Sequence, residues 1–90
     1  MKDADGLYYY PNPANKKIRM YVRMQEGEVC FRMKNDEDPE MWEKHGWIPY
    51  DAVVAASLME ENKRFNPLKV YDIALAEELL REAVESEFLT

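Results

Sequence analysis

Two segments in which apolar and polar residues alternate strictly, joined by a short turn, most constrain how this chain can fold. Residues 17–24 read Lys-Ile-Arg-Met-Tyr-Val-Arg-Met, and residues 28–34 read Glu-Val-Cys-Phe-Arg-Met-Lys. A period of two places successive side chains on opposite faces of a β-strand. Gly27, in the turn between the segments, supplies the positive φ that a tight hairpin needs. The pattern therefore predicts a β-hairpin with one apolar face and one basic face.

The register of this hairpin also follows from the pattern. With Glu26 and Gly27 as a two-residue loop, each apolar residue of one strand meets an apolar residue of the other, and a slip of one residue would break that match. The predicted apolar pairs are Met24 with Val29, Val22 with Phe31, and Met20 with Met33. The predicted pairs on the opposite face are Arg23 with Cys30, Tyr21 with Arg32, and Arg19 with Lys34.

The N-terminal segment predicts one further strand. Leu7 to Tyr10 is short and aromatic, a composition that favours a strand. The prolines and asparagines of residues 11–15 are typical of a turn. Residues 1–6 are polar, and we expect them to fray. Together with the hairpin, this strand completes a predicted meander of three strands.

The C-terminal half predicts helices. Asp38 and Pro39 suit the cap and the first position of a short helix. Two longer helices are expected at residues 49–64 and, with Asp72 as the cap, at about residues 73–88. The predicted fold is α+β: a three-stranded antiparallel β-meander followed by a short helix and two longer helices packed on one sheet face.

Length and composition favour one small globular domain over residues 1–90, since 47% of the 90 residues are hydrophobic and 33% are charged. The single cysteine, Cys30, cannot form a disulfide within the chain, which favours a cytoplasmic protein. The first fifteen residues lack the basic start and the apolar run of a signal peptide. No apolar stretch approaches the roughly 18 residues of a membrane span, so we expect no membrane partner.

Charge is divided unevenly along the chain. The net charge is −6, which excludes a uniformly basic nucleic-acid-binding protein. Residues 16–34 nevertheless carry six basic and two acidic side chains, whereas residues 35–90 carry five basic and 14 acidic ones. One short basic segment therefore belongs to an otherwise acidic protein.

The basic face of the hairpin is the first candidate binding site. Its predicted members are Arg19, Tyr21, Arg23, Arg32 and Lys34. Cations with an aromatic ring between them suit single-stranded nucleic acid, because phosphates meet the charge and bases stack on the ring. The like-charge pair that the register predicts destabilises an isolated hairpin, and a bound anion, a carboxylate of the acidic helices or a carboxylate of a second copy of the chain would each relieve it. A solvated or self-paired face and a protein-binding face therefore stay open beside the nucleic-acid site.

Two tryptophans form the second candidate. Trp42 and Trp47 lie within six residues of each other, with His45 between them. They could anchor an interface, because tryptophan is common among residues that dominate binding energy, or they could fasten a short helix to the core. Leu79 and Leu80, on the apolar side of the last predicted helix, could instead pair two copies of the chain in a homodimer.

The sequence shows no catalytic or metal-binding pattern. Cys30 and His45 could act as a nucleophile and its base, but nothing in the spacing brings them together. One histidine without a nearby histidine or cysteine does not predict a metal site. The acidic run of residues 35–38 lacks the glycine and the distant glutamate of a calcium loop. We therefore expect no enzyme activity, no cofactor and no metal.

The first functional hypothesis is a non-enzymatic interaction module that binds a protein partner or itself. The segregated charge would set the orientation and the rate of such an encounter. The alternative is a nucleic-acid-binding module that uses the basic and aromatic hairpin face. A further alternative is an acidic mimic of nucleic acid, which would present the glutamates of the last helix to a basic cleft: Glu77, Glu78, Glu82, Glu85 and Glu87.

Overall fold

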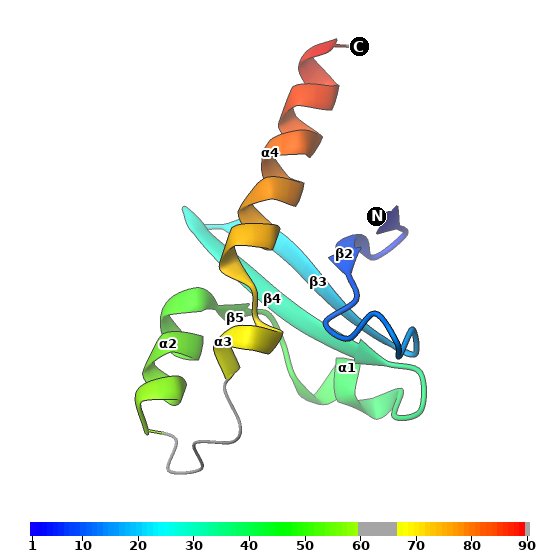
Figure 1. The fold of residues 1–90 in the computed structure, drawn as a ribbon, viewed down its shortest axis with the longest axis vertical. Coiled ribbons are helices and arrows are strands. Elements are labelled where there is room, and N and C mark those ends of the chain that lie inside the picture. Colours follow the sequence, from blue (N-terminus) through cyan, green and yellow to red (C-terminus); the bar gives the residue numbers. More distant parts are fainter. Residues whose placement is uncertain (60–66, 90) are drawn as a thin grey trace.

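The computed structural model describes residues 1–59 and 67–89. In this part of the chain, five strands form one antiparallel sheet in sequence order (Figure 1). The strands are β1 (Lys2–Asp3), β2 (Gly6–Tyr9), β3 (Ile18–Gln25), β4 (Glu28–Asn35) and β5 (Ile48–Pro49). The helices are α1 (Glu40–Lys44), α2 (Tyr50–Met59), α3 (Pro67–Val70) and α4 (Ile73–Leu89). The α+β class is confirmed, but the count of three strands is wrong, because β1 and β5 are too short to leave a periodic pattern.

The central hairpin of β3 and β4 has the predicted register throughout. Met20 pairs with Met33 and Tyr21 pairs with Arg32, and the six other residue pairs follow in step. Glu26 and Gly27 have φ values of 54° and 81°. Both residues of the two-residue loop are therefore in the left-handed region that a type I′ hairpin turn requires.

The prediction that residues 1–6 fray is wrong. Lys2 pairs with Leu7 and Asp3 with Gly6, so β1 adds an edge strand to β2. The backbone N–H of Tyr8 donates a hydrogen bond to the carbonyl of Met1 at 3.0 Å. The two residues of β1 are too few to show a periodic pattern. The side chains that hold Asp3, those of Arg19 and Tyr21, lie far along the chain.

The helices differ from their predictions in detail. Pro39, not Asp38, is the N-cap of α1, and no side chain caps this helix. The predicted cap of α4 is confirmed, since Asp72 Oδ1 accepts a hydrogen bond from the N–H of Leu75 at 3.1 Å. α2 is described as far as Met59, and its predicted end at residue 64 lies outside the described residues.

The apolar face of the sheet forms the core. Tyr9, Met20, Val22 and Phe31 are buried on this face, and Ala76 of α4 packs against them. The Phe31 ring also meets two aromatic rings from the helical half, those of Tyr50 and Tyr71, at 6.1 and 5.5 Å between centroids. The distal half of α4 extends beyond the sheet (Figure 1).

The sequence predicted that all helices pack on one face of the sheet, and this prediction is wrong for α1. α1 lies beside β4, at the end of the sheet away from the hairpin turn (Figure 1). Trp42 of α1 contacts Tyr21, whose side chain points away from the core formed by Met20 and Val22. One short helix therefore contributes to the face opposite α4.

One tyrosine joins the sheet to the start of α4. The Tyr9 hydroxyl donates a hydrogen bond to the carbonyl of Val70 at 2.6 Å and accepts one from the N–H of Asp72 at 2.9 Å. Both backbone groups lie at the junction of α3 and α4, which explains how β2 fixes where α4 begins. Burial of the phenol raises the pKa of Tyr9 to about 12.

We predict that Tyr9→Phe lowers the free energy of unfolding by about 1–3 kcal/mol, because it leaves two backbone groups without their partner. The raised pKa of Tyr9 also means that folding favours the neutral phenol. Stability should be intact below the ordinary tyrosine pKa near 10 and should fall as the pH rises toward 12.

Urea unfolding between pH 7 and pH 11 measures both effects. Tyr50→Phe is the matched control, because no hydrogen bond of the Tyr50 hydroxyl is found among the described residues. Equal losses in the two variants would contradict the role of Tyr9. An alkaline loss of stability that is unchanged in Tyr9→Phe would contradict the assignment of the pKa.

Candidate functional site

The basic face of the hairpin is covered by other parts of the same chain. Tyr21 is completely buried on this face and Cys30 is 3% exposed. The rings of Trp42 and Tyr8 both contact the Tyr21 ring, with centroid distances of 5.2 Å for Trp42, which lies edge-on, and 5.4 Å for Tyr8. We name this side of the sheet the outer face. Tyr21 is therefore covered by aromatic rings from α1 and β2 in this structure, which agrees with the alternative of a self-paired face.

Asp3 of β1 organises one end of the outer face. Its carboxylate accepts a hydrogen bond from the Tyr21 hydroxyl at 2.6 Å and an ion pair from Arg19 at 3.2 Å. Burial alone would raise the pKa of Asp3. The hydrogen bonds from Tyr21 and from the N–H of Asp5, followed by the charge of Arg19, outweigh burial and hold the pKa of Asp3 below its ordinary value.

Two arginines of the outer face stack on tryptophan. The Arg32 guanidinium lies 3.9 Å from the centroid of Trp42, and the Arg23 guanidinium lies 4.2 Å from the centroid of Trp47. Arg32 also donates hydrogen bonds to the carbonyl oxygens of Trp42 and His45. These contacts fix the segment after α1 against β4.

The other cations of the hairpin are paired with carboxylates. Arg19 binds Asp36 at 2.9 Å in addition to Asp3, and Lys34 binds Asp5 at 2.7 Å. Lys17 binds Glu37 at 2.8 Å. The predicted like-charge pair of Arg19 and Lys34 exists, and acidic residues of the same chain compensate it. Two residues of the acidic run 35–38, Asp36 and Glu37, thus form ion pairs with Arg19 and Lys17.

The two tryptophans and two leucines that were predicted as interface residues are all partly covered within the chain. Trp42 and Trp47 are half-buried and contact each other edge-on at 6.3 Å. Leu79 and Leu80 are half-buried and pack against the core. The structure does not test whether either pair also contacts another molecule, so the interface at these residues stays a prediction.

Cys30 and His45 are not brought together in the described part of the chain. Cys30 lies on the outer face with its thiol 3.8 Å from the carbonyl of Glu28, and burial raises the pKa of this thiol. His45 follows α1 and lines a pocket that also contains Met33, a residue on the core side of β4. A raised thiol pKa lowers the fraction of reactive thiolate.

A hollow that the sequence did not predict lies between the turn end of β4 and the starts of α2 and α4. It has a volume of about 390 Å³ and is lined by Glu28, Val29, Tyr50, Asp51, Ile73 and Glu77. We name it the acidic hollow. Contact with the Asp51 carboxyl, through a hydrogen bond and through its charge, raises the pKa of Glu28. Within residues 1–59 and 67–89, no basic side chain lines the hollow, so its carboxyls have no cation beside them there.

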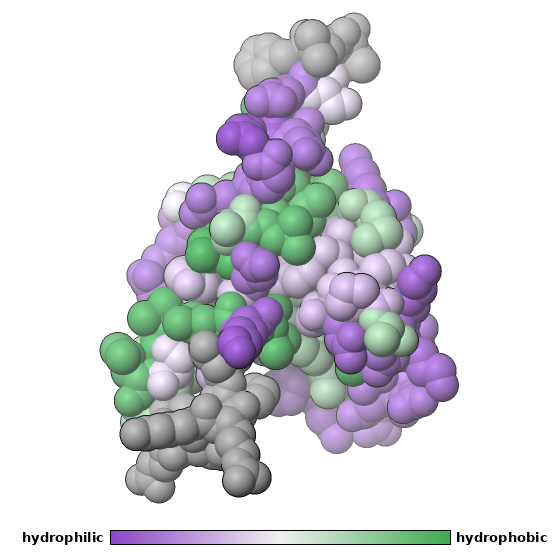
Figure 2. All heavy atoms as spheres, viewed as in Figure 1, coloured by the Kyte–Doolittle hydropathy of each residue, from purple (hydrophilic) through white to green (hydrophobic). Residues whose placement is uncertain are grey.

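The surroundings of the acidic hollow are partly apolar. Figure 2 shows apolar surface over the base of α4 and over α2, and hydrophilic surface over the distal half of α4. The exposed apolar side chains include Leu75 and Val84 of α4 and, at 82% and 81% exposed, Leu58 and Met59 of α2. Carboxylates beside exposed apolar side chains can bind the long side chains of lysine and arginine.

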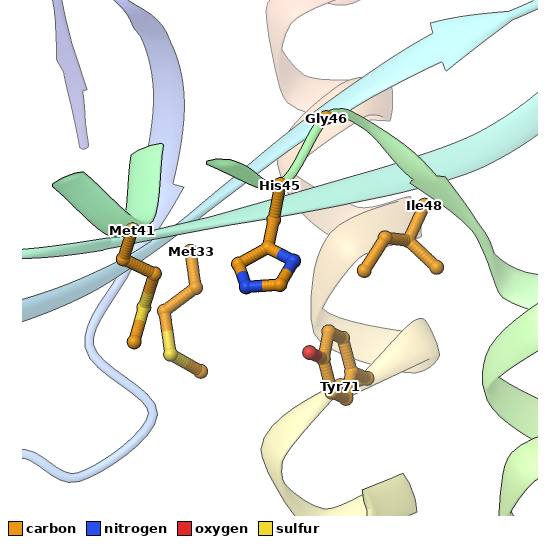
Figure 3. Close-up of a pocket in the computed structure, with 6 residues that line it drawn as sticks. All are labelled: Met33, Met41, His45, Gly46, Ile48 and Tyr71. Carbon is orange, nitrogen blue, oxygen red and sulfur yellow. The ribbon is translucent and has the colours of Figure 1, made fainter. Parts of the chain in front are cut away.

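A second pocket, of about 330 Å³, lies between β4, α1 and the connection from α3 to α4. We name it the methionine pocket, after two of its six lining residues: Met33, Met41, His45, Gly46, Ile48 and Tyr71. Figure 3 shows the side chains of Met33, Met41 and His45 pointing to the same side of the ribbon. Sequence patterns place His45 between two tryptophans and near no other common metal ligand, and they do not reveal that Met33 lines the same pocket.

Neither a membrane span nor a cluster of common metal ligands is found in the described structure. Within residues 1–59 and 67–89, no helix combines the length and apolar character needed to cross a membrane. Within the same residues, no three or more His, Cys, Asp or Glu side chains are grouped to hold a metal ion. Comparisons with protein-family models, curated proteins and solved structures find no match for this chain.

We predict that Asp3→Asn loosens β1 and the outer face, because it removes the charge that binds Arg19 and weakens the acceptor for Tyr21. A lowered pKa means that folding favours the carboxylate. The stabilisation from Asp3 should therefore be present above the ordinary pKa of 3.8 and be lost as the pH falls below it.

Stability measured by urea between pH 2 and pH 7, with hydrogen exchange at the N–H of Tyr8, tests this role. Asp3→Asn should flatten the acid loss of stability and speed exchange at Tyr8, which bonds to Met1. Glu43→Gln is the control, since Glu43 is exposed on α1 and has no salt bridge among the described residues. Wild-type exchange at Tyr8 in Asp3→Asn would show that Asp3 does not hold β1.

Proposed function

We propose that this protein is a non-enzymatic interaction module that binds a basic protein partner through the acidic hollow and the adjoining side of α4. The observation that carries the proposal is that three carboxyls, those of Glu28, Asp51 and Glu77, line one hollow together with Val29 and Ile73. Two carboxyls in contact repel each other when ionised, and a cationic side chain would relieve that repulsion.

The distribution of charge supports an acidic binding surface. The hairpin cations are paired with carboxylates or stacked on tryptophan rings, as described above for Arg19, Arg23 and Arg32. The net charge of −6 is therefore concentrated on other parts of the molecule. An uncompensated acidic surface attracts basic partners and speeds their encounter.

The apolar side chains near the acidic hollow supply the second requirement of an interface. Protein interfaces combine apolar contact with a polar rim. Ile73 and Tyr50 line the hollow, and Leu75 is 38% exposed on the same helix. A lysine or arginine of the partner would lay its aliphatic stem on these side chains and direct its charge to Glu28 and Glu77.

The competing functions receive less support from this geometry. Single-stranded nucleic acid would have to displace the contacts that now engage the cations of the outer face. A homodimer formed by this acidic surface would place identical carboxylates opposite each other about a two-fold axis, which costs free energy. A mimic of nucleic acid would use the same surface as the proposal and would differ only in the class of basic protein that it binds.

We predict salt-sensitive binding of a short fluorescent peptide rich in lysine and arginine. Glu77→Lys should weaken this binding by about 1 kcal/mol, because an exposed ion pair contributes up to about that much and reversal replaces it with repulsion. Glu43→Lys is the matched control: it makes the same charge change at an exposed helical residue of α1, which does not line the hollow.

Fluorescence anisotropy at low and at moderate salt measures the binding. An acidic peptide and single- and double-stranded oligonucleotides serve as competing probes, and light scattering reports the oligomeric state. Equal weakening by Glu77→Lys and Glu43→Lys would contradict the acidic hollow as the site. Salt-sensitive binding of an oligonucleotide, with no binding of the basic peptide, would favour the nucleic-acid alternative instead.

A further inference from the structure

The methionine pocket collects three side chains with metal-donor atoms that have no other partner among the described residues. Met33 and Met41 supply thioether sulfurs, and His45 supplies an imidazole. No hydrogen bond or ion pair of the His45 side chain is found in the described part of the chain. Thioethers are soft ligands that select Cu(I), and imidazole is also a ligand of copper.

We propose that Met33, Met41 and His45 form a binding site for a soft monovalent cation, Cu(I). Among the described residues, no carboxylate lines the methionine pocket, so the site offers little to the hard cations Mg²⁺ and Ca²⁺, which take oxygen ligands. The two thioether sulfurs carry no charge, which suits a cation of single charge, because less charge has to be compensated in a partly apolar pocket.

Strand pairing and backbone hydrogen bonds hold the three residues in place. Met33 is paired with Met20 in the middle of the sheet. Met41 and His45 lie four residues apart, and the N–H of His45 donates a hydrogen bond to the carbonyl of Met41 at 3.1 Å. His45 is the C-cap of α1, so its backbone is held at the end of the helix that carries Met41. Arg32 fixes the backbone beneath His45 by donating a hydrogen bond to its carbonyl at 3.1 Å.

The side chains themselves can complete the site. In Figure 3 the side chains of Met33, Met41 and His45 extend in the same direction, and all three line the one pocket. Methionine has three rotatable bonds and adapts easily to a ligand, so the sulfurs can close on an ion without movement of the backbone. Ile48 and Tyr71 also line the pocket, whereas His45 is exposed to solvent, so an ion can enter from the His45 side.

The first test is a titration of the full chain with Ag(I), a redox-stable substitute for Cu(I), observed by NMR of ¹³C-labelled methionine methyl groups. We expect the methyl signals of Met33 and Met41 to shift together as one ion binds, with a matching shift of the His45 ring. The signal of Met24, which is 53% exposed at the hairpin tip, should not move. Shifts spread over all methionines, or none, would overturn the proposal.

The second test measures Cu(I) affinity by competition with a coloured Cu(I) chelator under anaerobic, reducing conditions. Met33→Leu and Met41→Leu should each weaken binding at least about tenfold, since loss of even an outer-shell partner of a metal costs about that much. Met→Leu nearly conserves volume, so the variants should fold, and circular dichroism checks this. Met24→Leu is the matched control and should bind as wild type.

A separate variant must test Cys30, because a thiol is a stronger ligand of Cu(I) than a thioether. It is buried on the outer face and does not line the methionine pocket. Cys30→Ser should therefore retain Cu(I) binding, and His45→Phe should weaken it. Binding that disappears in Cys30→Ser but persists in Met33→Leu and Met41→Leu would assign the ion to the thiol and refute the site.

Discussion

The pairing of β3 with β4 is the constraint on which the rest of the structure depends. Its register sends Met20 and Val22 to one side of the sheet and Arg19 and Tyr21 to the other. The first side is apolar and accepts α4. The second side is basic and aromatic, and it can be buried only if carboxylates and rings cover it. A slip of one residue would exchange the two sides and leave both α4 and Asp3 without their partners.

Sequence patterns predicted the hairpin, its turn and α4, because each is defined by local periodicity or by a residue with special backbone geometry. They did not predict the covering of Tyr21, since Asp3 and Trp42 lie 18 and 21 positions away in the sequence and neither belongs to a periodic segment. The sequence left a self-paired face open but did not say which groups would pair. The structure shows that Arg19 and Lys34 become partly covered when carboxylates and aromatic rings from other elements lie against them.

The candidate sites were harder to predict than the fold for the same reason. Glu28 lies at a turn, Asp51 in the first turn of α2 and Glu77 on the exposed side of α4, so local reasoning gives each an ordinary role. Only the three-dimensional arrangement makes them neighbours. Met41 and His45 had a usable signal, a spacing of four residues next to a helix, but Met33 joins them through the sheet, which no local pattern reports.

The way in which the chain neutralises its own cations also bears on the kind of partner it can bind. An ion pair made within the folded chain must be broken before either member can serve a ligand, so Arg19, which binds both Asp3 and Asp36, is costly to recruit. The contact of Glu28 with Asp51 is the opposite case, because a cation there relieves repulsion that folding leaves in place. Binding energy is therefore more readily gained at the acidic hollow than on the outer face, although the outer face carries more charge-bearing groups. A cationic partner thus fits the electrostatics of the folded chain better than an anionic one does.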